Sequence, residues 1–457
     1  MQEGTPSKGR PRKLRAVFAL ALAGVLSLSA CGSGDSGGGG AVTLEYWLWD
    51  ANQLPQYQKC ADDFHAANQN ITVNLTQTGW GDYWNNLTTN MNAGSGPDVF
   101  TDHLNYFADF ISKKQIVDLQ PYIDRDGVDL SIYYPGLADL WKDQNGHSFG
   151  LPKDWDTIAV FYNEKMVTDA GYSADDLKNM TWNPDDGGTY EKIIAHLTVD
   201  ENGKRGDEAG FDKTKVAVYG LAMTSSGAGF SQQQLSQYLF TTGWTFTDKN
   251  PWGTQYNFAD PNFKKTVAWY YSLVEKGYMN PLSVATSMGG SAADSFAAGK
   301  FAFVTEGDWN ISSVKAPADS KTLFAPNPIG PNGKRASMFN GLTDAINSAS
   351  KHQDEAWLWV KYLGSEQCQA HVAEAGVVFP AIKSLSDQTI KAREAAGQDI
   401  SAFMVHVQDG TTFPPPISDH YPDVLAIQQP VMDDIMSGKV GVDALDAANE
   451  QINALFK

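Results

Sequence analysis

Alternating apolar and polar positions predict a β-strand over 42–48, and a helical pattern over 55–68 follows it. The same order repeats downstream, with a strand at 71–75, a helix at 83–93, a strand at 98–101 and a helix at 105–113. Strands that alternate with helices are typical of βαβ units and predict a largely parallel sheet. Such sheets bind ligands beyond the carboxyl ends of their strands, so the turns after Leu48, Leu75 and Phe100 are candidate functional positions.

A second α/β region is predicted from residue 157 onward. The continuous apolar run at 158–162 suits a strand covered on both faces. Further strands are predicted at 216–223 and 300–304, with helices at 232–240 and 263–276. Because single cores stop growing at roughly 250 to 300 residues, a chain of 457 residues predicts two or more domains.

The first 40 residues have a different composition. A basic segment precedes an apolar run at 16–28 that ends in Leu-Ser-Ala-Cys, and the run is too short to span a bilayer stably. This N-terminus resembles that of bacterial lipoproteins, which implies a signal peptide over 1–30, a lipid on Cys31 and attachment to the outer face of the cell membrane. A cleaved signal with an incidental cysteine is the alternative. Residues 31–40 have the composition of a flexible Gly/Ser tether.

Charge and cysteine content narrow the possible partners. A net charge of −19 argues against nucleic acid and anionic lipid headgroups, and leaves neutral or cationic ligands. Besides Cys31 the chain has only Cys60 and Cys368, which could form one disulfide or remain two buried thiols. The acidic loop at 200–213 lacks EF-hand spacing, so no metal or cofactor is expected.

Several segments in a fixed order resemble the extracellular solute-binding proteins (family 1) of carbohydrate ABC importers. They are PDVF at 97–100, GLPKDWDTIAVFYNEKMV at 150–167, FAAGKFAFVTEGDWN at 296–310, GLTDAINSASKHQDEAWLWVKYL at 341–363 and GVVFPAIKS at 376–384. The resemblance implies an α/β, two-lobed periplasmic-binding-protein-like fold with discontinuous lobes and a central ligand cleft. It also implies a monomer whose ligand-bound form is recognised by a membrane permease.

The resemblance also implies where the lobes divide. The first lobe is expected to comprise 41–153 plus 333–378, and the second 157–330 plus 381–457. Cys60 and Cys368 then fall in the same lobe, which makes their pairing more plausible.

Sugar binding requires aromatic platforms for the apolar faces of the rings, together with carboxylates and amides for the hydroxyls. Trp309 follows a predicted strand and matches the stacking tryptophan of the family. Trp80 and Trp155 are expected in loops and are further platform candidates, whereas Trp357 and Trp359 lie in a helical pattern that favours core packing.

The polar candidates follow the predicted strands or flank the first crossing between lobes. They are Asp50, Asn52, Asp102, His103, Asp154 and Asp156. Helix capping or a solvated surface is the alternative role for the carboxylates, and capping or packing is the alternative for His103. Gln232, Asn340 and Phe379 complete the ligand-binding candidates, with a structural role equally open for each.

These features predict an extracytoplasmic receptor that delivers a neutral mono- or oligosaccharide to the permease subunits of an ABC transporter, without enzymatic activity. A surface-anchored carbohydrate-active enzyme is the alternative, because Asp154 and Asp156 are two apart on an extended segment and point the same way. No G-x-S-x-G, H-E-x-x-H or Walker motif accompanies them. A purely adhesive lipoprotein is a third possibility.

Overall fold

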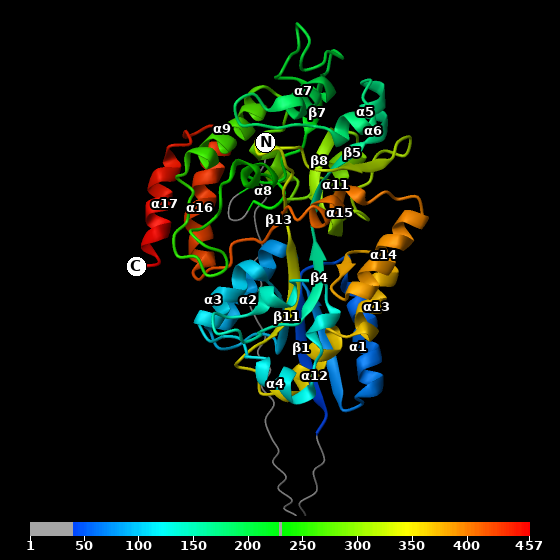
Figure 1. The fold of residues 1–457 in the computed structure, drawn as a ribbon, viewed down its shortest axis with the longest axis vertical. Coiled ribbons are helices and arrows are strands. Elements are labelled where there is room, and N and C mark those ends of the chain that lie inside the picture. Colours follow the sequence, from blue (N-terminus) through cyan, green and yellow to red (C-terminus); the bar gives the residue numbers. More distant parts are fainter. Residues whose placement is uncertain (1–39, 228–230) are drawn as a thin grey trace, which may run out of the picture. The chain divides into compact units, whose positions relative to one another are not determined.

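The computed structural model describes residues 40–227 and 231–457 (Figure 1). The predicted signal peptide, Cys31 and nearly all of the tether lie outside the described residues. Residues 41–457 form one compact unit. None of the helices within the described ranges is long and apolar enough to cross a bilayer.

The first sheet has six strands in the order β12-β4-β11-β3-β1-β2. Their bounds are β1 Val42–Leu48, β2 Ile71–Gln77, β3 Val99–His103, β4 Pro152–Asp156, β11 Asn340–Ile346 and β12 Phe379–Pro380. β1 runs parallel to β2 and β3, as predicted. The expectation of a largely parallel sheet is wrong for the other half, because β11 returns from late in the chain and pairs antiparallel with β3 and β4.

Helices pack on both faces of this sheet because its strands carry apolar side chains on both sides. The core that includes Leu44 and Tyr46 of β1 also contains buried side chains of three helices, α1 Leu54–Ala67, α12 Gln353–Leu363 and α13 Glu366–Ala375. A separate core around Phe100 of β3 takes in α2 Trp80–Asn92 and α3 Leu104–Ser112. Trp357 and Trp359 of α12 are fully buried, which confirms their predicted core role.

Cys60 of α1 and Cys368 of α13 form a disulfide, with Sγ atoms 2.10 Å apart. The bond joins two helices on the same face of the sheet, 308 residues apart in sequence. Of the two states that the cysteine count leaves open, the structure therefore has the paired one.

The second sheet has five strands in the order β6-β7-β8-β5-β9. Their bounds are β5 Ile158–Asn163, β6 Val199–Asp200, β7 Val216–Leu221, β8 Phe301–Gly307 and β9 Thr322–Ala325. Every residue of β5 is buried, as its continuous apolar sequence predicts. This sheet is also mixed, since β7 and β8 are parallel while β5 is antiparallel to both of its neighbours.

The core of the second sheet includes side chains of α7 Gly188–Leu197, α8 Ser236–Leu239, α9 Pro261–Glu275, α16 Tyr421–Met436 and α17 Ala444–Ala454. The helix predicted over 232–240 is reduced to α8, because Ser231 has a positive φ of 55° and turns precede Ser236. The remaining elements are α4 Gln120–Asp126, α5 Glu164–Asp169, α6 Ala174–Lys178, α10 Leu282–Ser287, α11 Ala293–Ala297, α14 Lys383–Ala395, α15 Ser401–Gln408, β10 Ser337–Met338 and β13 Thr412–Phe413, with short 3₁₀ helices at Leu130–Ile132, Ala138–Trp141, Phe240–Thr242 and Asp308–Asn310.

The strands of the first sheet come from residues 42–156 and 340–380, and those of the second from residues 158–325. The chain passes from one sheet to the other through Thr157, between β4 and β5. The exact lobe boundaries stay a prediction.

Candidate functional site

Strand register brings several predicted site residues to one edge of the first sheet. β11 lies between β3 and β4 and runs antiparallel to both, so its first residues lie beside the ends of those strands. Asn340 is opposite Asp156, and Leu342 is opposite both His103 and Asp154. Residues far apart in sequence therefore meet where β3 and β4 end.

Asp156 is the centre of a buried polar cluster at this edge. Gln232 Nε2 donates to Asp156 Oδ1 at 2.6 Å, and Asn340 Nδ2 donates to Asp156 Oδ2 at 3.4 Å. Asn340 Nδ2 also lies 2.8 Å from His103 Nε2. Gln232 comes from the segment before α8, so the cluster links the edge of the first sheet to the region of the second.

Burial shifts the acidity of both carboxyls of β4. The amide N–H of Leu342 donates to Asp154 Oδ1 at 3.1 Å. Burial raises the pKa of Asp154 to about 7, although the positive charge of Lys153 acts in the opposite direction. Burial, reinforced by the negative charge of Asp154, raises the pKa of Asp156 to about 8. Both carboxyls are therefore poised to change charge near neutral pH.

The end of β8 adds a third carboxyl to the cluster. The Asp308 N–H donates to the carbonyl of Thr157 at 3.3 Å, which places Asp308 beside the crossing that follows Asp156. Burial and the charge of Asp156 raise the pKa of Asp308, and Arg393 of α14 opposes this shift. Glu306 accepts from Gln233 Nε2 at 2.5 Å and from Asn310 Nδ2 at 2.8 Å, and burial raises its pKa to about 7.

Trp309 directly follows this strand, as predicted, in the 3₁₀ helix Asp308–Asn310. Its indole packs against the backbone of Gly307, where a Cβ atom would lie only 1.8 Å from Trp309 Cζ3. Gly307 is therefore required for the position of the ring. The Trp309 side chain is only partly buried, so part of its surface remains accessible.

A group of aromatic side chains lies at the same edge of the first sheet. The Trp80 ring is 5.1 Å from that of Trp49, 5.4 Å from that of Trp84 and 5.4 Å from the imidazole of His103, measured between centroids. Trp80 is 42% exposed. It is the first residue of α2 rather than a loop residue, because the helix begins earlier than the sequence pattern predicts. Trp80 and the partly exposed Trp49 provide an accessible aromatic surface beside His103, which contacts Asn340 of the polar cluster.

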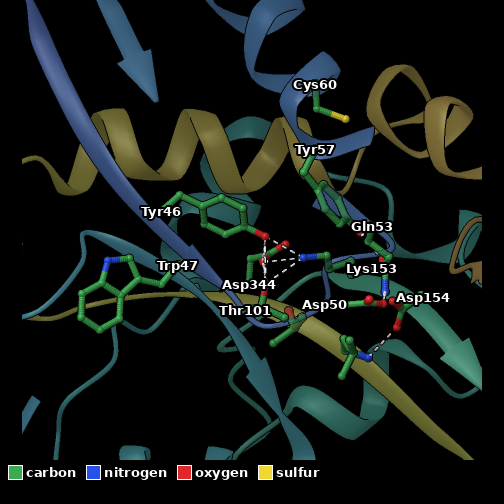
Figure 2. A network of polar contacts seen from close by, with 12 residues as sticks. Tyr46, Trp47, Asp50, Gln53, Tyr57, Cys60, Thr101, Lys153, Asp154 and Asp344 are labelled. Atoms are coloured by element: carbon green, nitrogen blue, oxygen red, sulfur yellow. Dashed lines mark hydrogen bonds and ion pairs between the residues drawn. The ribbon is translucent and has the colours of Figure 1, made fainter. Parts of the chain in front are cut away.

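A buried ion pair lies within the strands that carry this edge (Figure 2). Lys153 Nζ lies 3.0 Å from Asp344 Oδ1 and donates to Tyr46 Oη at 2.6 Å and to Thr101 Oγ1 at 2.8 Å. Tyr46 and Thr101 also donate to Asp344. The ammonium lies 3.9 Å from the centre of the Tyr57 ring. The network therefore ties together β1, β3, β4 and β11, whose ends carry the site.

Asp50 joins this network from the turn after β1. Gln53 Nε2 donates to Asp50 Oδ2 at 2.8 Å, and Tyr57 Oη donates to Gln53 Oε1 at 3.0 Å. Asn52 is exposed, and its backbone N–H donates to Asp50 Oδ1 at 2.8 Å. The turn geometry therefore explains Asn52 without a ligand, while Asp50 lies close enough to Asp154 to raise the pKa of that carboxyl.

Trp155, a predicted platform, and Phe379, a further ligand-binding candidate, occupy positions that favour a core role. Trp155 is expected in a loop but lies inside β4, is 0% exposed and stacks on Phe379 of β12 at a centroid distance of 4.8 Å. Its Nε1 donates to Ser386 Oγ at 3.0 Å. Phe379 is likewise buried. Side chains alternate along a strand, so Trp155 points away from the face that Asp154 and Asp156 share.

Asp102 and His103 lie within β3 instead of in a turn after it, because β11 extends the pairing as far as His103. Asp102 Oδ1 accepts from the backbone N–H of His103 at 2.8 Å, and burial raises the pKa of Asp102. His103 caps α3 by accepting from the Asn105 N–H, and burial lowers its pKa to about 3. It is therefore a neutral imidazole near pH 7.

Several residues of the site are absent from the sequence-based candidates. Trp49 immediately precedes Asp50 after the first strand, and Glu306 and Asp308 flank Gly307 in the segment that carries Trp309. Their positions at strand ends are signals that would have identified them. Arg393 has no such signal, since it lies on a helix 85 residues beyond Asp308 in a segment with no marked motif.

Comparison with known proteins places this arrangement in a family. The galactooligosaccharide-binding protein of Bacillus subtilis is 24% identical over 389 residues, which cover 83% of each chain. The Listeria monocytogenes ABC substrate-binding protein in complex with cycloalternan has a TM-score of 0.76 at 16% identity, covering 91% of this chain and 98% of that one. The GacH receptor of Streptomyces glaucescens, solved unliganded and with acarbose, has a TM-score of 0.72 at 20% identity, covering 91% and 98%.

The two solved structures establish the fold, which is that of two-lobed binding proteins, as predicted. The family model of bacterial extracellular solute-binding proteins matches residues 50–370, which include Trp80, all of β4, β8 and β11, and both cysteines of the disulfide. The chain therefore belongs to the bacterial extracellular solute-binding protein family.

Proposed function

We propose that the protein is an extracytoplasmic sugar receptor that delivers its ligand to the permease of an ABC transporter. The observation that carries the proposal is that aromatic and hydrogen-bonding side chains lie together at one edge of the first sheet. Gln232 and Asn340 both donate to Asp156 at the edge of the first sheet, and Trp80 contacts His103 beside Asn340, with Trp49 alongside. Trp309 follows Asp308, whose backbone N–H donates to the carbonyl of Thr157. Aromatic faces suit the C–H surfaces of sugar rings, and carboxylates and amides suit their hydroxyls.

The relatives support the same ligand class. The Bacillus protein is named for galactooligosaccharides, and the Listeria structure holds cycloalternan. Binding without turnover is the simplest function for a family of binding proteins, so we retain it in preference to the alternative, a carbohydrate-active enzyme.

Calorimetry with a panel of mono- and oligosaccharides tests this function. Saturable binding of at least one sugar, recovered chemically unchanged after overnight incubation, is the expected result. Release of shorter sugars would instead support an enzyme, and the absence of any binding across the panel would contradict the receptor. A ligand at 100 times its Kd stabilises the fold by about 2.7 kcal/mol, so thermal shift suffices for a first screen.

The membrane attachment is a separate part of the proposal. It rests on the sequence around Cys31, which lies outside the described residues. Cys31→Ala is expected to leave sugar affinity intact and to release the protein from the membrane fraction. A variant that still sediments wholly with membranes after a salt wash would contradict the lipid anchor.

Lobe closure is the third part. We expect the lobes to comprise 41–153 plus 333–378 and 157–330 plus 381–457, and a monomer to close around its sugar at the crossings. Hinges of this kind absorb rotation in a few residues while the lobes stay rigid. Small-angle scattering with and without a verified ligand is the test, since an unchanged radius of gyration at saturation would argue for a rigid site.

A further inference from the structure

Helix α16 takes part in two hydrophobic cores. Its side chains Val424, Met432 and Ile435 pack in the core of the second sheet. Tyr421, the first residue of the helix, is only 2% exposed but belongs to the other core, the one around Phe100 of β3. The start of α16 therefore packs against α3, which covers the first sheet (Figure 1).

Hydrogen bonds fix the segment that leads into α16. Asn250 Nδ2 donates to the carbonyl of Pro415 at 2.7 Å, and Asn250 Oδ1 accepts from the Ile417 N–H at 3.0 Å. The Trp252 N–H donates to the carbonyl of Ile417 at 2.6 Å. Because Ile417 is buried in the same core as Tyr421, this segment is anchored on the first sheet.

A series of aromatic rings connects Tyr421 to the exposed Trp80. The Tyr421 ring meets that of Tyr106 on α3 edge to face, at a centroid distance of 5.1 Å. Tyr106 stacks on Trp84 at 3.7 Å, with the two ring planes 5° apart. The Trp84 ring in turn lies 5.4 Å from that of Trp80. The series therefore reaches from α16 to a side chain of the aromatic surface at the candidate site.

Packing fixes the orientation of Trp84, because its buried indole N–H has no hydrogen-bond partner within the described ranges. Trp80 and Trp84 are four residues apart on α2, so their side chains lie on the same face of the helix. Trp80 is 42% exposed, and the rings of Trp84, Trp49 and His103 support it from the protein side. Protein interiors are closely packed, so the loss of one ring lets its neighbours move into the space.

We propose, as a refinement that rests on the sugar-binding function above, that Tyr421 is a positioning residue for the aromatic surface. Through Tyr106 and Trp84 it holds Trp80 in the orientation that binds the sugar. Tyr421 is buried, so it acts through these rings and not by contact with the ligand. Sugar affinity then depends on the contact between α16 and α3, which joins the cores of the two sheets.

A double-mutant cycle tests the proposal, because it measures the coupling between two positions directly. Calorimetry would first compare glucose, maltotriose, cellotriose, mannotriose and galactotriose, and the sugar that binds the wild-type protein most tightly would be used for every variant. Tyr421→Leu keeps an apolar side chain in the core but removes the ring, and is expected to weaken binding about fivefold or more. In a Trp80→Ala background, the same change is expected to weaken binding less than about twofold, because the side chain that it positions is already absent.

Two further variants separate the ring contact from a general loss of packing. Tyr421→Phe keeps the ring and is expected to bind the sugar as tightly as the wild-type protein. Tyr270→Leu is the matched control, since Tyr270 of α9 is also 2% exposed but packs in the core of the second sheet, and it should leave the affinity unchanged. Should Tyr421→Leu fold poorly, Tyr421→Met provides a more adaptable side chain for the same comparison.

The outcomes separate the two proposals. Equal weakening by Tyr421→Leu with and without the Trp80 ring would overturn the positioning role and leave the sugar receptor standing. Unchanged affinity in Tyr421→Leu or in Trp80→Ala, or an equal loss in Tyr421→Phe or Tyr270→Leu, would do the same. Failure of the entire panel to bind would overturn both proposals.

Discussion

Lys153→Met is expected to destabilise the protein strongly, because it removes one partner of a buried ion pair. The ammonium and the Asp344 carboxylate are each 3% exposed and 3.0 Å apart. Breaking such a pair typically costs about 3 to 5 kcal/mol, since the remaining charge stays buried without compensation. The lost contact with the Tyr57 ring, at 3.9 Å, acts in the same direction.

Urea unfolding followed by tryptophan fluorescence gives the free energy of unfolding from the midpoint and the slope. The double variant Lys153→Met/Asp344→Asn is expected to recover most of the loss, because it leaves no uncompensated charge. Lys165→Met serves as the control, since the ion pair of Lys165 with Asp169 is exposed and should leave the midpoint almost unchanged.

Exposed ion pairs contribute less than about 1 kcal/mol, so a decrease in the free energy of unfolding of that size in Lys153→Met would refute the reasoning. It would mean that water or a rearranged side chain compensates Asp344. A double variant as unstable as the single one would locate the effect in packing of the lysine side chain and not in its charge.

Three further predictions concern the site and the disulfide. Trp309→Ala is expected to weaken sugar binding by about 1 to 3 kcal/mol, measured by calorimetry, with a smaller loss of stability than the ~3 to 5 kcal/mol of a core tryptophan; unchanged affinity would remove Trp309 from the site. The ligand-free protein should lose stability as the pH rises from about 4 to about 8, because the raised pKa values of Asp154 and Asp156 make the folded state bind more protons than the unfolded one. Thermal unfolding across this range is the measurement, and the melting temperature of Asp156→Asn should fall less steeply with pH than that of the wild-type protein. Cys60→Ser/Cys368→Ser should lower the free energy of unfolding by about 2 to 5 kcal/mol in urea titrations, and an unchanged midpoint would show that the bond does not constrain the unfolded chain.

Local patterns were sufficient to predict most of the elements that carry the site. The strand at 42–48 and the buried strand beginning at residue 158 lie where the sequence predicts them, because their side-chain pattern is set by neighbouring residues. The relative directions of the strands in the first sheet could not be predicted in the same way. They depend on β11, which begins 184 residues after the end of β4 and inserts between β3 and β4.

The same long-range pairing explains the errors at individual residues. β11 extends β3 through His103, which moves Asp102 and His103 out of the predicted turn. Trp155 could have been assigned to the core from the sequence, because alternation that places Asp154 and Asp156 on one face places the residue between them on the other. The effect of the Arg393 charge on the pKa of Asp308 depends on the tertiary packing of α14, and no local sequence pattern indicates it.

The position of β11 between β3 and β4 also sets an order of events during synthesis and folding. The two strands that end in His103 and Asp156 have no pairing with each other until residues 340–346 arrive between them. Cys60 must likewise wait for Cys368. The candidate site therefore cannot assemble before about three-quarters of the chain has been made, and a product truncated ahead of residue 340 would contain most of the candidate side chains without the strand that brings them together.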